Sequence, residues 1–119
     1  MTNNQLAYYP PKEIIKIGFS TSDGVILFNF HEILYLQGQR NYTKVYAIGN
    51  SVLVSKNLSE ILSMLPPSFI RIHKSYIVNI NLVKNIDYIN SVVELITGER
   101  IPFSIRLKKN LQIILQGVK

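Results

Sequence analysis

The apolar residues of this chain come in short runs, and no unbroken aliphatic or aromatic run exceeds four residues, as in Val25–Phe28. Turn-forming residues, such as Ser22-Asp23-Gly24 and Gly49-Asn50, separate these runs. Short runs with turn signals between them are typical of strands joined into antiparallel hairpins. A membrane-spanning helix needs about twenty apolar residues, so we expect no membrane insertion. The pattern predicts a mostly-β domain.

Ten segments have this strand-type pattern. In residues 42–48, Tyr, Lys, Tyr and Ile alternate with Thr, Val and Ala, which places the two sets on opposite faces of a strand. We predict hairpin loops at Gly49-Asn50 and Asn90-Ser91. The ten predicted strands cover residues 14–19, 25–30, 33–36, 42–48, 52–55, 69–73, 76–80, 83–89, 92–97 and 100–103.

Two segments have helical spacing instead. The first begins with Asn57 as its N-cap and Glu60 three residues later, and Pro66-Pro67 ends it. The second follows Ser104, a candidate cap, and its apolar residues recur at positions 107, 111, 114, 115 and 118. The fold class is therefore β with minor α, built from small antiparallel sheets and two short helices.

A length of 119 residues fits one domain. Residues 1–12 are largely polar and contain two prolines near their end, so we expect a flexible tail or the remnant of a linker there. The domain itself is expected over residues 13–119.

The charge of the chain is asymmetric. Lys and Arg number 13 against seven Asp and Glu, a net charge of +6, and no acid follows Glu99. Such a balance favours a positive face that attracts a polyanion and releases its counterions. The alternative is a soluble basic protein whose lysines are simply solvated.

Patterns that carry catalysis or cofactors are missing from the sequence. The chain has no cysteine and two histidines, which leaves no thiolate nucleophile and no cysteine-built metal site. The six glycines are scattered at turns rather than gathered in a phosphate loop, and no serine occupies a Gly-x-Ser-x-Gly elbow. We therefore predict a protein that is not an enzyme and that uses no cofactor and no metal.

Residues 69–81, Phe-Ile-Arg-Ile-His-Lys-Ser-Tyr-Ile-Val-Asn-Ile-Asn, resemble the signature segment of the LytTR DNA-binding domain family. Four other pieces resemble the family in the same order along the chain, so that the resemblance covers about residues 14–115. They are Glu32–Leu36, Gly38–Val45, Leu58–Leu62 and Ile101–Arg106. The family forms the output domain of many bacterial response regulators.

The resemblance implies an elongated arrangement of small antiparallel sheets, in which loops rather than a recognition helix enter the major groove of DNA. It implies three contact regions: the loop 38–42, Lys74 within its segment, and Arg106 after the Pro-Phe-Ser turn. Arginine and lysine suit guanine, asparagine suits adenine, and serine and lysine suit phosphates. The candidate DNA-binding residues are Arg40, Asn41, Tyr42, Lys44, Arg71, His73, Lys74, Ser75, Ser104, Arg106, Lys108 and Lys109.

Several of these residues have structural alternatives. In these alternatives, Arg40 and Lys44 are solvated loop charges and Tyr42 packs across its hairpin. Likewise, Arg71 and His73 would brace the loop that carries Lys74 instead of contacting DNA. Asn79 lies within an apolar run, so we expect it to bond the backbone.

The leading hypothesis is a cytoplasmic, sequence-specific regulator of transcription that binds double-stranded DNA. By resemblance, it binds paired direct repeats as two copies side by side, either alone or with a sensor or receiver-domain partner. One alternative is a protein-interaction module that engages a sensor or membrane partner through open strand edges. Another is a general, charge-driven nucleic-acid binder that stacks bases on Tyr35, Tyr42, Tyr46 and Tyr76.

Overall fold

The computed structural model describes residues 16–115, apart from the side chains of Ile113 and Ile114. The predicted tail, residues 1–12, lies outside this range. As predicted, the described range contains ten strands and two α-helices, to which it adds two short 3₁₀-helices. The strands are β1 (Lys16–Thr21), β2 (Gly24–Asn29), β3 (Ile33–Gln39), β4 (Tyr42–Ala47), β5 (Asn50–Val54), β6 (Phe69–His73), β7 (Tyr76–Asn79), β8 (Val83–Asp87), β9 (Val92–Leu95) and β10 (Arg100–Pro102).

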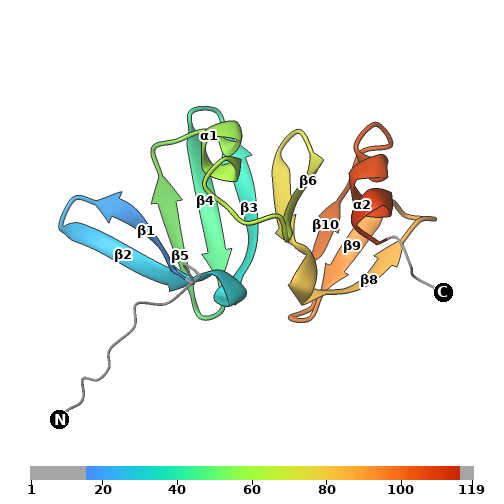
Figure 1. The fold of residues 1–119 in the computed structure, drawn as a ribbon, viewed down its shortest axis with the longest axis horizontal. Coiled ribbons are helices and arrows are strands. Elements are labelled where there is room, and N and C mark those ends of the chain that lie inside the picture. The colour runs from blue at the N-terminus through green and yellow to red at the C-terminus, as the bar shows by residue number, and fades with distance from the viewer. Residues whose placement is uncertain (1–15, 116–119) are drawn as a thin grey trace, which may run out of the picture.

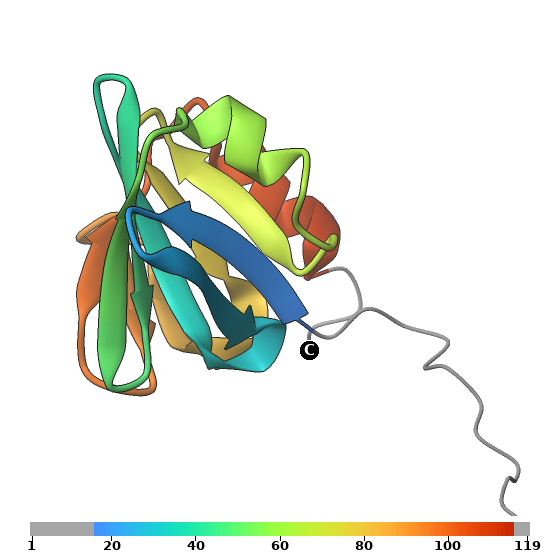
Figure 2. The same cartoon turned by 90° about the vertical axis from the view of Figure 1, so that its left-hand side faces the viewer.

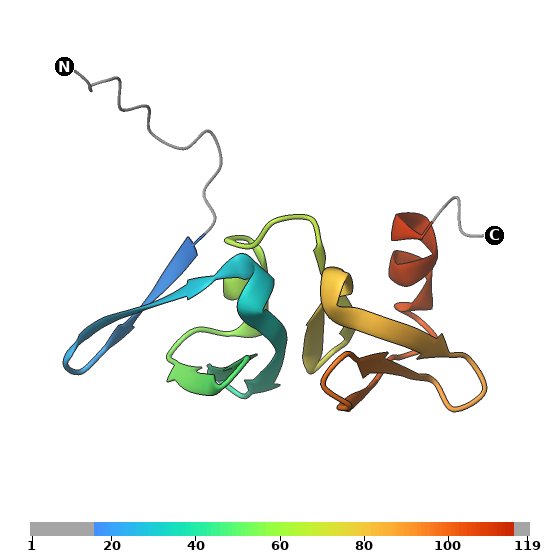
Figure 3. The same ribbon diagram turned by 90° about the horizontal axis from the view of Figure 1, so that it is seen from below.

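The strands form three antiparallel sheets, which confirms the predicted fold class. The central sheet has the order β5-β4-β3-β7-β6, the C-terminal sheet has the order β10-β9-β8, and β1 pairs with β2 alone. Figure 1 shows the three sheets side by side along the molecule, and Figure 3 shows the hairpin β1–β2 at the opposite end from β8 and α2 (Lys108–Ile114). Figure 2 looks along this axis. The radius of gyration is 16.5 Å, against about 13 Å for a compact domain of this size, so the shape is elongated.

The central sheet separates two hydrophobic cores. One face packs on the hairpin β1–β2 and on α1 (Leu58–Leu62), with Leu36, Val45 and Ile77 from the sheet. The opposite face contributes Leu34 and Val78 to a core shared with β8–β10 and α2. A bulge near the start of β3 interrupts the alternation of faces, so that the successive residues Leu34 and Tyr35 both face this second core.

The predicted cap of α1 is confirmed. The Asn57 side chain accepts a hydrogen bond from the Glu60 N–H at 2.9 Å, and the Glu60 carboxylate accepts one from the Asn57 N–H at 3.0 Å. The helix ends at Leu62 rather than directly before Pro66, because the last turn before the prolines has i to i+3 bonds such as Leu65 N–H to the Leu62 carbonyl.

The hairpin between β4 and β5 has a different loop from the predicted one. Ala47 pairs with Asn50, so that the two loop residues are Ile48 and Gly49, one position earlier than Gly49-Asn50. Gly49 has a φ of 77°, a conformation that glycine adopts without a Cβ penalty. The glycine therefore takes the second loop position.

Two 3₁₀-helices, η1 (Phe30–Glu32) and η2 (Ile80–Leu82), were not predicted. Each turns the chain between two strands that belong to different sheets. The Asn-x-x-Glu spacing of Asn29 and Glu32 was the available signal for η1, because the Glu32 carboxylate accepts the Asn29 N–H at 2.8 Å. The Asn79 side chain accepts the Asn81 N–H at 3.1 Å and so caps η2.

Candidate nucleic-acid interface

Three turns of the chain lie at one edge of the molecule. They are the β3–β4 turn, the β6–β7 turn and the segment between β10 and α2, all at the upper edge in Figure 1. Backbone bonds link them: the Gly38 N–H donates to the Ser75 carbonyl at 2.9 Å, and the Ser104 N–H donates to the Ile72 carbonyl at 2.8 Å. The fold therefore brings the three contact regions implied by the resemblance to a common edge.

The β3–β4 turn presents Arg40 and Asn41 to solvent. Arg40 has a φ of 60°, a left-handed conformation that costs free energy for a residue with a Cβ. Tyr42 is 47% exposed beside it. Lys44 points elsewhere, because its Nζ lies 5.1 Å from the centre of the Tyr46 ring on the face of the sheet.

The β6–β7 turn is held by Arg71. The Arg71 guanidinium donates to the Ser59 hydroxyl at 3.0 Å and to the carbonyl oxygens of His73 and Lys74. The Ser75 N–H donates to Nδ1 of His73 at 3.0 Å, which closes the turn from the other side. The geometry of Arg71 and His73 fits the bracing alternative. Lys74 is exposed at the tip of the turn.

A shallow hollow of about 200 Å³ connects the first two turns. It contains three cationic side chains and two hydroxyl groups, a set that suits an anionic oxygen. Gly38 lets α1 approach, because a Cβ there would meet Leu58 at 3.0 Å. The lining residues are Gly38, Arg40, Asn57, Leu58, Ser59, Arg71, Lys74 and Ser75.

The segment between β10 and α2 presents Ile105 and Arg106, both exposed. The Ser104 hydroxyl accepts the Leu107 N–H at 3.1 Å and so closes the turn before α2, but it is not the helix cap that the sequence predicted, because α2 begins at Lys108. Lys109 is exposed, whereas the Lys108 Nζ lies 4.7 Å from the centre of the Tyr88 ring. The structure thus places Lys44 and Lys108 against aromatic rings, apart from the cations of the hollow.

Sequence reasoning missed Asn110. Its side chain donates to the Arg71 carbonyl at 3.0 Å and so ties α2 to the strand before the β6–β7 turn. No local pattern marks this contact, because its partners are 39 positions apart.

The rings of the tyrosines on the sheet face contact one another, and Gln37 hydrogen-bonds two of them. Tyr35 and Tyr46 are stacked with ring centres 4.4 Å apart, and Tyr76 lies 6.3 Å from Tyr35. The Gln37 amide donates to the Tyr76 hydroxyl at 3.2 Å and accepts from the Tyr46 hydroxyl at 3.5 Å. Stacking of Tyr35 on Tyr46 occupies ring faces that a base-stacking platform would need.

Burial, followed by the nearby charge of ionised Tyr46, raises the pKa of Tyr35 to about 12 from 10.0. The neutral phenol is favoured in the folded state, so this group stabilises the fold below pH 10 and loses that contribution as the pH rises towards 12. We expect the wild type to lose stability relative to Tyr35→Phe across this window. Urea unfolding of both proteins at several alkaline pH values measures the difference. Parallel curves would contradict the prediction.

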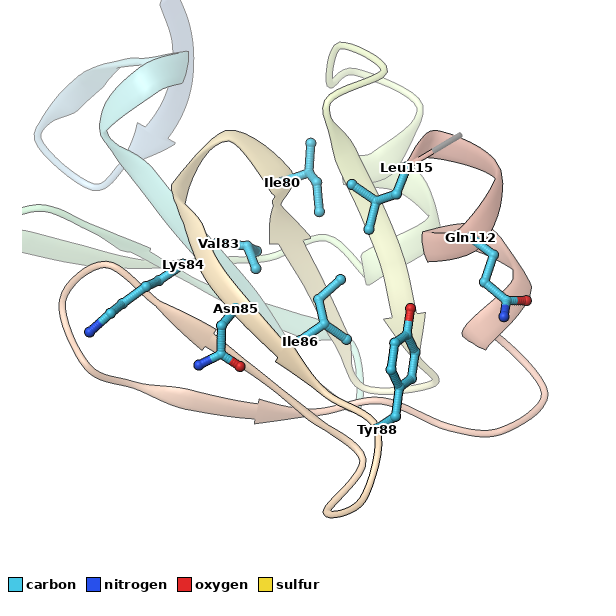
Figure 4. Close-up of a pocket in the computed structure, with 8 residues that line it drawn as sticks. All are labelled: Ile80, Val83, Lys84, Asn85, Ile86, Tyr88, Gln112 and Leu115. Atoms are coloured by element: carbon cyan, nitrogen blue, oxygen red, sulfur yellow. The ribbon is translucent and has the colours of Figure 1, made fainter. Parts of the chain in front are cut away.

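A larger hollow of about 480 Å³ lies between β8 and α2, apart from the three turns (Figure 4). Its lining is mostly apolar, and none of the predicted site residues belongs to it. The residues are Ile80, Val83, Lys84, Asn85, Ile86, Tyr88, Gln112 and Leu115.

Within residues 16–115, no group of three or more His, Asp or Glu is arranged to hold a metal ion. The same range has no helix that is long and apolar enough to cross a membrane.

A β-sheet body that presents cationic turns along one edge is typical of a protein that contacts a polyanion through loops. The family model of the LytTr DNA-binding domain matches residues 23–116, most of the chain. The chain belongs to the LytTR family of DNA-binding domains, which act in the regulation of transcription.

Relatives agree with this assignment. The chain is 32% identical over 104 residues to the sensory transduction protein LytT of Bacillus subtilis, an alignment that covers 84% of this chain and 43% of LytT. It is 32% identical over 72 residues to the transcriptional regulatory protein YpdB of Escherichia coli K12, covering 60% of this chain and 30% of YpdB. The chain therefore spans less than half the length of these relatives.

A solved structure has the same fold. It is the LytTr DNA-binding domain of a Bacillus cereus protein described as a methyl-accepting/DNA response regulator. The TM-score is 0.75 at 30% sequence identity, and the match covers 87% of this chain and 99% of that one. The predicted family and its sheet arrangement are confirmed.

Proposed function

We propose that this chain binds double-stranded DNA sequence-specifically and contacts the major groove with its three edge turns. The observation that carries the proposal is that Arg40, Lys74 and Arg106 are exposed on three separate turns that backbone bonds hold at one edge. Backbone bonding fixes the spacing of the turns, and fixed spacing is what base recognition requires of side chains from different loops.

The roles divide by chemistry. Arg106 and Lys74 contact guanine edges, and Asn41 contacts an adenine edge, with Arg40 and Tyr42 beside it. Ser75 and Lys109 contact phosphates. Ser104 and Lys108 also contact phosphates, and in doing so they exchange their present contacts with the Leu107 N–H and the Tyr88 ring. Arg71 and His73 act through the turn that they hold rather than on the bases, because the Arg71 guanidinium bonds Ser59 and two carbonyls.

Family membership supports the rest of the proposal. Because the chain belongs to a DNA-binding family, we place the protein in the cytoplasm and assign it no catalytic reaction. We also propose paired direct repeats as the target, with two copies side by side and a receiver or sensor as the regulatory partner.

Selection of binding sequences from a random duplex pool at about physiological salt tests the main proposal. We expect a repeated motif, bound about a thousandfold or more tightly than random duplex. A pool that stays random, with binding abolished by modest salt, would instead indicate a charge-driven binder and end the proposal.

The phosphate role of Lys109 has its own test. Lys109→Ala should weaken binding to all duplexes alike and reduce the slope of log K against log salt by about one unit. Lys84→Ala is the matched control, because Lys84 lies on β8, below α2 in Figure 1 and away from the three turns. Anisotropy titrations over a salt series measure both slopes. A changed base preference in Lys109→Ala would show that the residue contacts bases.

A further inference from the structure

Ile105 is 85% exposed at the edge that carries the three turns. Turns favour Gly, Pro, Asn, Asp and Ser, so an isoleucine gains nothing from the local chemistry of this position. Ser104 and Arg106 flank it in sequence, and after Leu107 come Lys108 and Lys109 at the start of α2. An exposed apolar side chain thus lies next in sequence to the exposed Arg106.

The backbone around Ile105 is fixed on both sides. The Ser104 N–H donates to the Ile72 carbonyl at 2.8 Å, which attaches the segment to β6. The Ile105 carbonyl accepts the Lys108 N–H at 3.3 Å, and the Leu107 N–H bonds Ser104. The backbone of Ile105 therefore has a defined place on this edge, where its side chain is 85% exposed.

Single exposed apolar residues are ordinary, and Ile89, 95% exposed in the β8–β9 turn, is one of them. Ile105 differs in its location, since it lies on the edge that carries the three turns, where Arg40, Lys74 and Arg106 are exposed. Among the base edges in the major groove, the apolar group available for contact is the C5-methyl group of thymine. Contact between the two would remove both methyl surfaces from water and would distinguish thymine from cytosine.

We propose that Ile105 is a specificity-determining residue that packs on the C5-methyl group of a thymine next to the base contacted by Arg106. The inference rests on the proposed function and adds an apolar contact to the hydrogen-bonding ones. Because burial of one methyl group is favourable by an amount equivalent to about fourfold in affinity, the contact has a measurable signature.

The test uses the duplex obtained from the random pool. Each thymine in the motif is replaced in turn by deoxyuridine, which lacks the methyl group and keeps every hydrogen-bonding atom. Affinities are measured for the wild type, for Ile105→Ala and for Ile89→Ala as the matched control. We expect one thymine at which the wild type and Ile89→Ala lose about fourfold, whereas Ile105→Ala loses almost nothing.

Other outcomes overturn the proposal in distinguishable ways. A motif without a thymine at which deoxyuridine weakens the wild type shows that no methyl contact exists. A loss of equal size in Ile105→Ala and the wild type assigns the contact to another residue. A pool that yields no motif removes the proposed function, and this inference with it.

Discussion

Arg106→Ala should weaken binding to the selected duplex by about 1–3 kcal/mol, or roughly 5- to 150-fold. Arg106 is exposed at the tip of the third turn and can donate two hydrogen bonds to one guanine. Lys74→Ala, at the tip of the second turn, should have an effect in the same range. Because both side chains are exposed, we expect the thermal unfolding of each variant to match that of the wild type.

The matched control is Arg100→Ala. Arg100 lies on β10, and its guanidinium contacts the Asp87 carboxylate at 3.4 Å, so the change removes one positive charge away from the three turns. Its affinity should stay close to the wild-type value at moderate salt. Losses below a few tenths of a kcal/mol in both Arg106→Ala and Lys74→Ala, with the fold intact, would contradict the assignment of the interface.

Local patterns predicted much of the fold. The alternation in residues 42–48 predicts a strand, because side chains along a strand face the core and the solvent in turn. Thr43, Val45 and Ala47 are indeed buried. The capping box of Asn57 and Glu60 is equally local, since all of its partners lie within four residues. Such features need no knowledge of the rest of the chain.

The sequence did not show which distant partners the side chains contact, and it left Arg71 open as a DNA contact or as a brace of its turn. The role of Arg71 depends on Ser59, twelve positions away, and Lys108 is turned towards Tyr88 by a packing contact. A bulge in β3 also changes which residues share a face, and no residue type announces it. The candidate interface was predicted from the order of the family segments, whereas the side-chain contacts within it depend on tertiary packing.

Asn79 is the polar residue whose loss should destabilise the fold most. It is 1% exposed, and its side-chain amide donates to the Phe30 carbonyl at 3.2 Å and to the Ile33 carbonyl at 3.0 Å. These bonds join the end of β7 to the chain as it enters β3. The sequence predicted that Asn79 bonds the backbone. The structure confirms this role and identifies the two carbonyl partners.

Asn79→Ala leaves two carbonyl oxygens without this donor and opens a small cavity between β7 and η1. We expect the free energy of unfolding to fall by about 2–4 kcal/mol. Urea unfolding followed by circular dichroism measures it, and an unchanged denaturant slope would assign the loss to the folded state. Asn85→Ala is the control, because the Asn85 amide bonds Glu94 at an exposed position, where removal should cost less than about 0.5 kcal/mol.

Asn79→Asp separates the two contributions. Aspartate has nearly the same size and so leaves no cavity, but a carboxylate cannot donate to either carbonyl and repels both. If the hydrogen bonds dominate, Asn79→Asp should destabilise the fold at neutral pH at least as much as Asn79→Ala. Recovery at acid pH should follow, because the protonated carboxyl group regains one donor. A mild effect of Asn79→Asp beside a large one of Asn79→Ala would show instead that side-chain volume is what the joint between β7 and β3 requires.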